Sequence, residues 1–118
     1  MAYHVSNVSV CKVKRGFTLK PGRNNIHGHG VYFSTRMEMQ YAPAHAADVV
    51  VFKIDNKALI CVGNETCPYL RTQGKAIRIN AYSAKTVAVK NLTAAVRRRT
   101  EDSVKSITVV YIKDYNLV

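Results

Sequence analysis

The stretch Asp48–Ile54, which reads DVVVFKI, decides the fold class of this chain. Its apolar run Val49-Val50-Val51-Phe52 is short, rich in β-branched residues and without a polar face, which is typical of a buried strand. A second run of the same kind, Ile107-Thr108-Val109-Val110-Tyr111, lies near the C-terminus. We therefore expect a central sheet that contains both runs.

Shorter extended segments lie on either side of these two runs. Residues Tyr3 to Val10 are expected to form an opening strand that passes into a short connecting or helical segment. Further strands are expected at Val31 to Ser34, Ala58 to Val62, Ile77 to Ile79 and Thr86 to Val89. The segments Lys20 to Asn25 and Gly63 to Gly74 are predicted as loops.

Two segments favour helices. Residues Thr35 to Ala47 are rich in Met and Ala, and Ser34 or Thr35 is a suitable N-cap, although Pro43 is expected to end or bend that helix. The basic segment Leu92 to Lys105 is the second candidate. Strands early and late with one or two short helices indicate an α+β domain, and 118 residues make a single domain over 1–118.

Composition also bears on location. No stretch approaches the roughly 20 apolar residues of a membrane-spanning helix, and the N-terminus lacks a signal-peptide pattern. The cysteines Cys11, Cys61 and Cys67 are odd in number, which favours free thiols in a reducing setting. We expect an intracellular protein, in the cytoplasm or nucleus and not secreted.

The charge is strongly positive. A net charge of +11 favours an anionic partner, either nucleic acid or an acidic protein, and half of the 18 basic residues lie between 71 and 105. The alternative is a solvated cationic face without a partner. No metal site is expected, because His27, His29, Cys61 and Cys67 do not have the spacing of a zinc knuckle.

An ordered set of motifs occupies the first half of the chain. It comprises Tyr3-His4-Val5-Ser6, Gly16-Phe17, Gly28-His29-Gly30-Val31-Tyr32-Phe33-Ser34, Tyr41 and the strand from Val49 to Ile54. In order and spacing, residues 3–54 resemble the ADP-ribosyltransferase superfamily, in particular its poly(ADP-ribose) polymerase-like branch. The resemblance implies a split β-sandwich of two small sheets with one or two short helices, and NAD in the cleft between the sheets.

The resemblance also implies roles for individual residues. His4 would hydrogen-bond the adenosine ribose of NAD, the Val5 backbone would pair with the nicotinamide carboxamide, and Ser6 stands where the family usually has threonine. Tyr32 and Tyr41 would flank the nicotinamide ring, since aromatic faces attract a flat cation.

Three further residues are assigned to the cofactor site. Gly30 and Ser34 belong to the same motif, and Arg23 is placed to reach the pyrophosphate. The alternative for the motif is structural: a tight turn explains Gly-x-Gly, and a histidine beside a tyrosine is more often a packing residue. Because Tyr32 and Phe33 point to opposite faces of a strand, one of them is expected in the core.

The expected catalytic acid is absent from its usual place. Transferases of this family carry a glutamate near the start of a late strand, where its charge stabilises a carbon that becomes positive. That position corresponds to Ile107, so we assign Glu101, together with His4 and Tyr32, as catalytic. Ion pairing with Arg97 to Arg99 is the alternative for Glu101 and Asp102.

Two functions follow from the resemblance. The first is an NAD-dependent mono-ADP-ribosyltransferase that modifies a protein or nucleic acid. The second is an inactive domain of the same fold that binds nucleic acid or a protein through its basic surface, which Ile107 and the lack of a serine near Glu38 favour. A third class, transferases that remove a 2′-phosphate from RNA, has an arginine-rich site pattern that this chain lacks.

Overall fold

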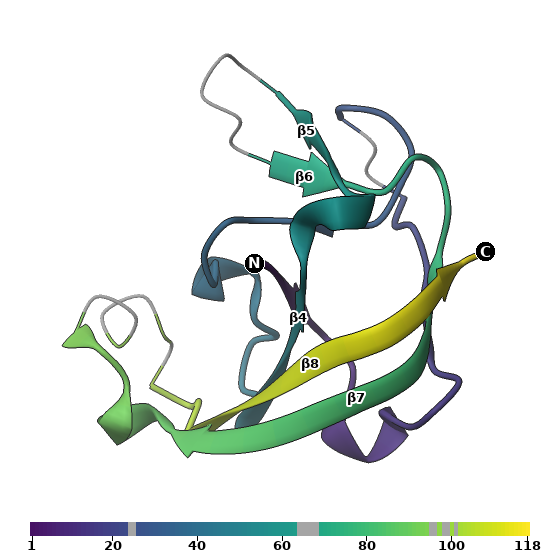
Figure 1. Ribbon diagram of the computed structural model, residues 1–118. Coiled ribbons are helices and arrows are strands. Elements are labelled where there is room, and N and C mark those ends of the chain that lie inside the picture. The colour runs from purple at the N-terminus through teal and green to yellow at the C-terminus, as the bar shows by residue number, and fades with distance from the viewer. Residues whose placement is uncertain (24–25, 64–68, 95–96, 98–99, 101) are drawn as a thin grey trace.

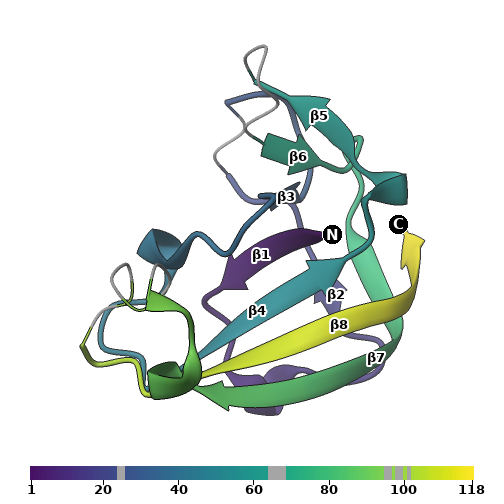
Figure 2. The same ribbon diagram turned by 60° about the vertical axis from the view of Figure 1, so that its left-hand side comes forward.

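The structure is a computed structural model that describes residues 1–23, 26–63, 69–94, 97, 100 and 102–118. Its strands form two sheets (Figures 1 and 2). The five-stranded sheet has the order β1-β4-β8-β7-β2, and the three-stranded sheet has the order β3-β6-β5. The strands are β1 (Ala2–Ser6), β2 (Thr18–Leu19), β3 (Tyr32–Phe33), β4 (Asp48–Ile54), β5 (Ile60–Val62), β6 (Tyr69–Arg71), β7 (Ile77–Ala88) and β8 (Ser106–Leu117).

Strand β4 lies inside the large sheet and has the predicted bounds. It pairs antiparallel with β1 and parallel with β8. Val50, Phe52 and Ile54 belong to one hydrophobic core, whereas Val49 and Val51 belong to a second. The strand needs no polar face because both of its faces are covered.

The first core fills the space between the two sheets. Its members come from both sheets and their connections: Ala2, Leu19, Val31, Phe33, Val50, Phe52, Ile54, Leu70, Ile77, Ile79, Val110 and Ile112. The second core lies on the opposite face of the large sheet and contains Met39, Val49, Val51, Val104 and Ile107. The prediction of two small sheets packed as a β-sandwich is confirmed at this level.

Strands β7 and β8 form a long antiparallel ribbon that runs along the front of Figure 1. The two short strands expected between 77 and 89 are a single strand, with a register shift between Ile79 and Tyr82. At one end of the ribbon, the carboxylate of Asp48 accepts hydrogen bonds from Ser106 Oγ at 2.6 Å and from Thr108 Oγ1. Pairing along the whole of β8 holds the polar middle of β7 extended.

The loop predicted from Gly63 to Gly74 contains β6, so that prediction is wrong for 69–71. Residues 64–68 lie outside the described part of the chain. Leu70 is buried in the first core, and β6 pairs with both β3 and β5. Three residues are too few to show a recognisable hydrophobic period, so this strand could not be predicted from the sequence.

The helix predicted over 35–47 does not form. Within this segment the structure has only the 3-10 turn η2 (Met39–Tyr41). Three other 3-10 turns lie in other parts of the chain: η1 (Val10–Lys12), η3 (Asn56–Ala58) and η4 (Val89–Asn91). Pro43 interrupts the segment, and His45 has a φ of 62°, which a continuous right-handed helix excludes. Met37 and Met39 nevertheless pack on the second core. Their apolar side chains are therefore explained by burial and do not indicate a helix.

The helix predicted over 92–105 falls partly on residues outside the described ranges. In its described part, Ala94 and Arg97 are helical, and Arg97 N donates to Thr93 O at 3.0 Å and Thr100 N to Arg97 O at 3.2 Å. The described chain is therefore β-rich, and within it no helix has the length and apolarity needed to cross a bilayer.

The cysteines differ from expectation. Cys11 is a free, exposed thiol, but Cys61 is disulfide-bonded. The prediction of free thiols is therefore wrong for Cys61. Because disulfides are typical of oxidising compartments, the cysteines no longer support an intracellular location.

Candidate functional site

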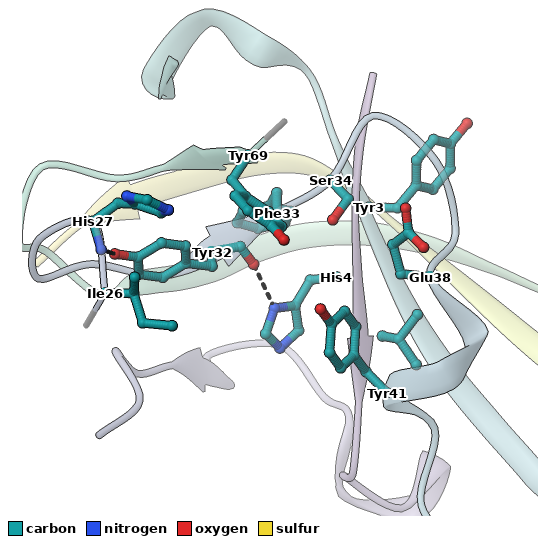
Figure 3. Close-up of a pocket in the computed structure, with 11 residues that line it drawn as sticks. Tyr3, His4, Ile26, His27, Tyr32, Phe33, Ser34, Glu38, Tyr41 and Tyr69 are labelled. Atoms are coloured by element: carbon teal, nitrogen blue, oxygen red, sulfur yellow. Dashed lines mark hydrogen bonds between the residues drawn. The ribbon is translucent and has the colours of Figure 1, made fainter. Parts of the chain in front are cut away.

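A cavity of about 400 Å³ opens between β1 and β3 (Figure 3). Its volume lies within the range of about 300–1,000 Å³ that is usual for small-molecule sites. We call it the His4 cavity. The described residues that line it are Tyr3, His4, Val5, Ile26, His27, Tyr32, Phe33, Ser34, Glu38, Tyr41 and Tyr69.

The cavity exists because β1 and β3 separate after a single bridge. Tyr3 and Ser34 exchange two backbone hydrogen bonds, of 2.8 and 2.9 Å. A continued antiparallel register would next pair Val5 with Tyr32. Instead, the carbonyl oxygen of Tyr32 accepts a hydrogen bond from Nδ1 of His4 at 2.7 Å. The imidazole therefore occupies the place of a backbone pairing.

This separation leaves the Val5 backbone open. The N–H and C=O of Tyr3 point away from β4, toward Ser34, and backbone groups two residues apart on a strand point to the same edge. The N–H and C=O of Val5 therefore point to the edge that faces the cavity, and no described residue bonds them there. A donor and an acceptor side by side match a carboxamide, which carries both functions.

His4 is a neutral acceptor toward the cavity. Burial lowers its pKa, and the hydrogen bond to the Tyr32 carbonyl offsets this only in part. Because a carbonyl can only accept, Nδ1 carries the proton, and in the neutral ring Nε2 is left as an acceptor. The ring packs 5.6 Å from Phe33 and 6.4 Å from Phe52, centroid to centroid.

Tyr32 presents its ring and not its hydroxyl. The hydroxyl accepts a hydrogen bond from the amide of His27 at 3.0 Å and donates one to the carbonyl of Gly28. Both functions of the phenol are thus used to hold the preceding loop, as Figure 3 shows for His27 and Tyr32. His27 in turn stacks on Tyr69, with centroids 5.8 Å apart.

Arg71 holds the same loop from the small sheet. Its Nε donates to the carbonyl of His27 at 2.7 Å. Gly28 has a φ of 96°, and a Cβ there would lie 2.6 Å from Nη2 of Arg71. A Cβ on Gly30 would overlap the carbonyl oxygen of Thr72. The positive φ therefore explains Gly28, and the close approach of the Thr72 backbone explains Gly30.

Glu38, Tyr41 and Tyr69 complete the other side of the cavity. The pKa of Tyr41 is raised by the partial burial of its hydroxyl, then by the neighbouring Tyr69 hydroxyl, and further by the charge of Glu38. The Glu38 carboxylate accepts a hydrogen bond from Gln40 Nε2 at 2.9 Å. Among the described lining residues, Glu38 is the only acid.

The structure brings together five of the predicted site residues, which are His4, Val5, Tyr32, Ser34 and Tyr41. Three others do not line the cavity: Ser6, Arg23 and Gly30. Ser6 is buried, and its hydroxyl accepts from the amide of Val8 at 3.0 Å, which closes the turn after β1. Arg23 is exposed on the loop that follows β2.

The predicted catalytic acid, Glu101, lies outside the described residues. Ile107, at the position where the resemblance places a glutamate, is 1% exposed and belongs to the second core. Its side chain therefore does not reach the His4 cavity.

Sequence reasoning missed six lining residues: Tyr3, Ile26, His27, Phe33, Glu38 and Tyr69. The resemblance marks the neighbourhood of Glu38 only by its lack of a serine, and Tyr69 lies in a segment predicted as loop. The signal for Tyr3 was its place beside His4 in the first motif. Phe33 lies in the Gly28 to Ser34 motif but was expected only as a possible core residue, and no local pattern marks Ile26 or His27.

No known protein family, curated protein or solved structure matches this chain. The geometry of the His4 cavity therefore carries the functional argument.

Proposed function

We propose that this chain is an NAD-dependent mono-ADP-ribosyltransferase that binds NAD in the His4 cavity. The observation that carries the proposal is the open edge of β1 at Val5, which lies beside a neutral imidazole and two tyrosine rings. When bound, NAD supplies an ADP-ribosyl group through cleavage of its bond to nicotinamide.

The described residues fit the nicotinamide end. The Val5 N–H donates to the carboxamide oxygen, and the Val5 carbonyl accepts from the carboxamide nitrogen. Tyr32 and Tyr41 offer ring faces to the flat cation, which aromatic quadrupoles attract. The exposed position of Tyr41, at 59% of its surface, leaves its ring accessible to a ligand.

His4 orients the adenosine ribose of NAD. Nε2 is an acceptor, so it takes a hydrogen bond from a ribose hydroxyl. The low pKa of His4 keeps that acceptor available at neutral pH, because protonation would turn Nε2 into a donor. The hydrogen bond to Tyr32 fixes the tautomer and the ring plane.

Glu38 supplies the negative charge in the cavity. Transfer makes the anomeric carbon of the ribose more positive, and a carboxylate beside that carbon lowers the barrier. A nucleophilic oxygen or nitrogen of the acceptor bonds to this carbon, nicotinamide leaves with the electron pair of the broken bond, and the nucleophile's proton passes to Glu38 or water. The acceptor is a protein side chain or a nucleic acid.

A second function is favoured by Ile107. A buried aliphatic side chain occupies the position where the resemblance places the catalytic glutamate. The alternative is therefore an inactive domain of the same fold that binds nucleic acid or a protein through its basic surface.

One experiment separates the two functions. NAD is titrated by calorimetry into the wild-type protein, Tyr41→Ala and Tyr41→Phe, and nicotinamide release is followed by chromatography on the same samples. The proposal expects binding and release in the wild type, retention in Tyr41→Phe, and weakening of about 5- to 10-fold in Tyr41→Ala. Binding without release supports the inactive domain, and absence of NAD binding rejects the proposed function.

A further inference from the structure

A second hollow lies on the other face of the large sheet. Its volume is about 300 Å³. We call it the Lys53 groove. Its lining includes Tyr3, Lys53, Ser83, Lys85, Val87, Val109 and Tyr111.

The strand register explains how this groove is built. Tyr3 is opposite Lys53, Lys53 is opposite Tyr111, and Tyr111 is opposite Ser83. Residues opposite one another on neighbouring strands share a face, so these four form a row across β1, β4, β8 and β7. Figure 2 shows the four strands side by side in this order. Lys85, opposite Val109, begins the adjacent row.

The chemistry of the groove combines cations with aromatic rings. Lys53 places Nζ 5.6 Å from the centroid of the Tyr111 ring, and Lys85 is exposed at the side of the groove. Its described lining contains two lysines, two tyrosines and no acid. This composition matches single-stranded nucleic acid, whose phosphates pair with lysine and whose bases stack on aromatic faces.

We infer that the Lys53 groove binds a single strand of nucleic acid. A duplex would offer phosphates to the lysines, but its stacked bases would not meet Tyr3, Tyr111 or the apolar Val87 and Val109. An acidic peptide would pair with the lysines and leave the rings without partners. The net charge of +11 draws any polyanion to the protein, and the rings select among polyanions.

Tyr3 lines both the Lys53 groove and the His4 cavity. A single nucleic-acid strand bound in the groove therefore lies beside the cavity in which NAD is proposed to bind. It is then the acceptor: one of its oxygen or nitrogen nucleophiles bonds to the ribose carbon, nicotinamide departs with the bonding electrons, and the displaced proton goes to solvent or Glu38. This acceptor role rests on the proposed function, whereas binding of the strand does not.

Binding is tested without NAD, by fluorescence anisotropy of a labelled 12-nucleotide DNA strand, its RNA counterpart, the DNA duplex and a polyglutamate peptide. The groove variant is Lys53→Gln/Lys85→Gln. Its matched control is Lys20→Gln/Lys57→Gln, which removes the same charge at exposed lysines outside the groove. Tyr111→Leu removes the ring face, and Tyr111→Phe retains it.

The groove variant is expected to bind a single strand about 10-fold more weakly, with the slope of log affinity against log salt reduced by about 1.4 because two phosphate contacts are lost. The control pair should change affinity by less than about 3-fold. Tyr111→Leu should weaken binding roughly 10-fold and Tyr111→Phe should restore it, since a stacking platform needs only the ring.

The inference is overturned by equal losses in the two lysine pairs, by duplex or peptide binding as tight as that of the single strand, or by no binding at all. NAD titration of the same variants keeps the two proposals apart. If the protein binds the nucleic-acid strand but not NAD, the groove proposal stands and the transferase proposal is rejected. If it binds NAD but not the nucleic-acid strand, the transferase proposal stands and the groove proposal is rejected.

Discussion

The imidazole of His4 donates to the main-chain carbonyl of Tyr32 at 2.7 Å, where a continued β1–β3 bridge would place the amide of Val5. One side chain thus satisfies the Tyr32 carbonyl, and the Val5 backbone stays open to the cavity. A buried backbone group without a hydrogen-bond partner costs free energy. Two strands therefore separate at low cost only where another group replaces the missing hydrogen bond. His4 is that replacement.

Stability should depend on the protonation of His4. Burial holds the pKa of His4 below its ordinary value of 6.5, so the unfolded chain binds a proton at a higher pH than the folded chain. The stabilising contribution is present above pH 6.5 and is lost as the pH falls toward the lower pKa of the folded state. We expect a slope of up to about 1.4 kcal/mol per pH unit from this residue, measured by urea unfolding between about pH 7.5 and pH 5.

His4→Gln is the comparison for this measurement, because glutamine does not titrate and its amide can still donate to the Tyr32 carbonyl. The variant should lose the His4 part of the slope. Identical slopes in variant and wild type would show that His4 does not titrate differently in the two states. NAD affinity of the wild type should fall over the same range, since protonated Nε2 no longer accepts.

Val5→Pro should weaken NAD binding without unfolding the protein. The Val5 N–H faces the open edge of an edge strand, a position where proline breaks no ladder hydrogen bond. Loss of this donor should cost about 10-fold in NAD affinity by calorimetry, with the free energy of unfolding within about 1 kcal/mol of wild type. Val5→Ala keeps the N–H and should bind normally, so equal weakening by both substitutions argues against the backbone contact.

Glu38→Gln should slow nicotinamide release by about 100-fold or more while NAD affinity stays within about 3-fold, because the charge acts mainly on the reacting carbon. Nicotinamide release is measured under single-turnover conditions with saturating NAD. Glu101→Gln serves as the matched control and should leave the rate unchanged. The opposite pattern would assign the role to Glu101, the acid expected from the sequence to replace the glutamate absent at Ile107.

Ile107→Glu should destabilise the protein and create no activity. The side chain is 1% exposed in the second core, so an introduced carboxylate is buried without a partner. We expect a loss of about 3–5 kcal/mol in urea unfolding at neutral pH, less at low pH where the carboxyl is neutral. Ile107→Val should cost only about 0.5–1.5 kcal/mol. A stable Ile107→Glu protein with faster nicotinamide release would place residue 107 in the cavity after all.

Gly28→Ala should disturb the loop that carries His27. The φ of 96° and the Arg71 guanidinium, 2.6 Å from the new Cβ, both oppose a side chain there. The expected destabilisation is about 1–3 kcal/mol, together with weaker NAD binding. At Gly22 a Cβ meets nothing within 4 Å, so Gly22→Ala should be neutral or slightly stabilising when both variants are compared with wild type by urea unfolding.

Much of the sandwich could be read from local pattern. The bounds of β4 were predicted correctly because four apolar residues in a row require cover on both faces. Residues 35–47 show the limit of this reasoning. Met37 and Met39 are apolar because they pack on the second core, and the same composition mimics a helix that Pro43 and the backbone at His45 exclude.

The candidate site likewise has a part that the sequence predicted and a part that only the tertiary structure decided. The sequence by itself predicted that His4 on the first strand and Tyr32 on the Gly-x-Gly strand meet at one site, and both line the His4 cavity. Only the tertiary structure decided that Glu38 and Tyr69 join them, that Ile107 turns into a core, and that Tyr3 connects the cavity to a basic groove. The physical reason is that a cavity forms where two strands stop pairing, and that point is set by contacts between residues far apart in the chain, which local periodicity does not encode.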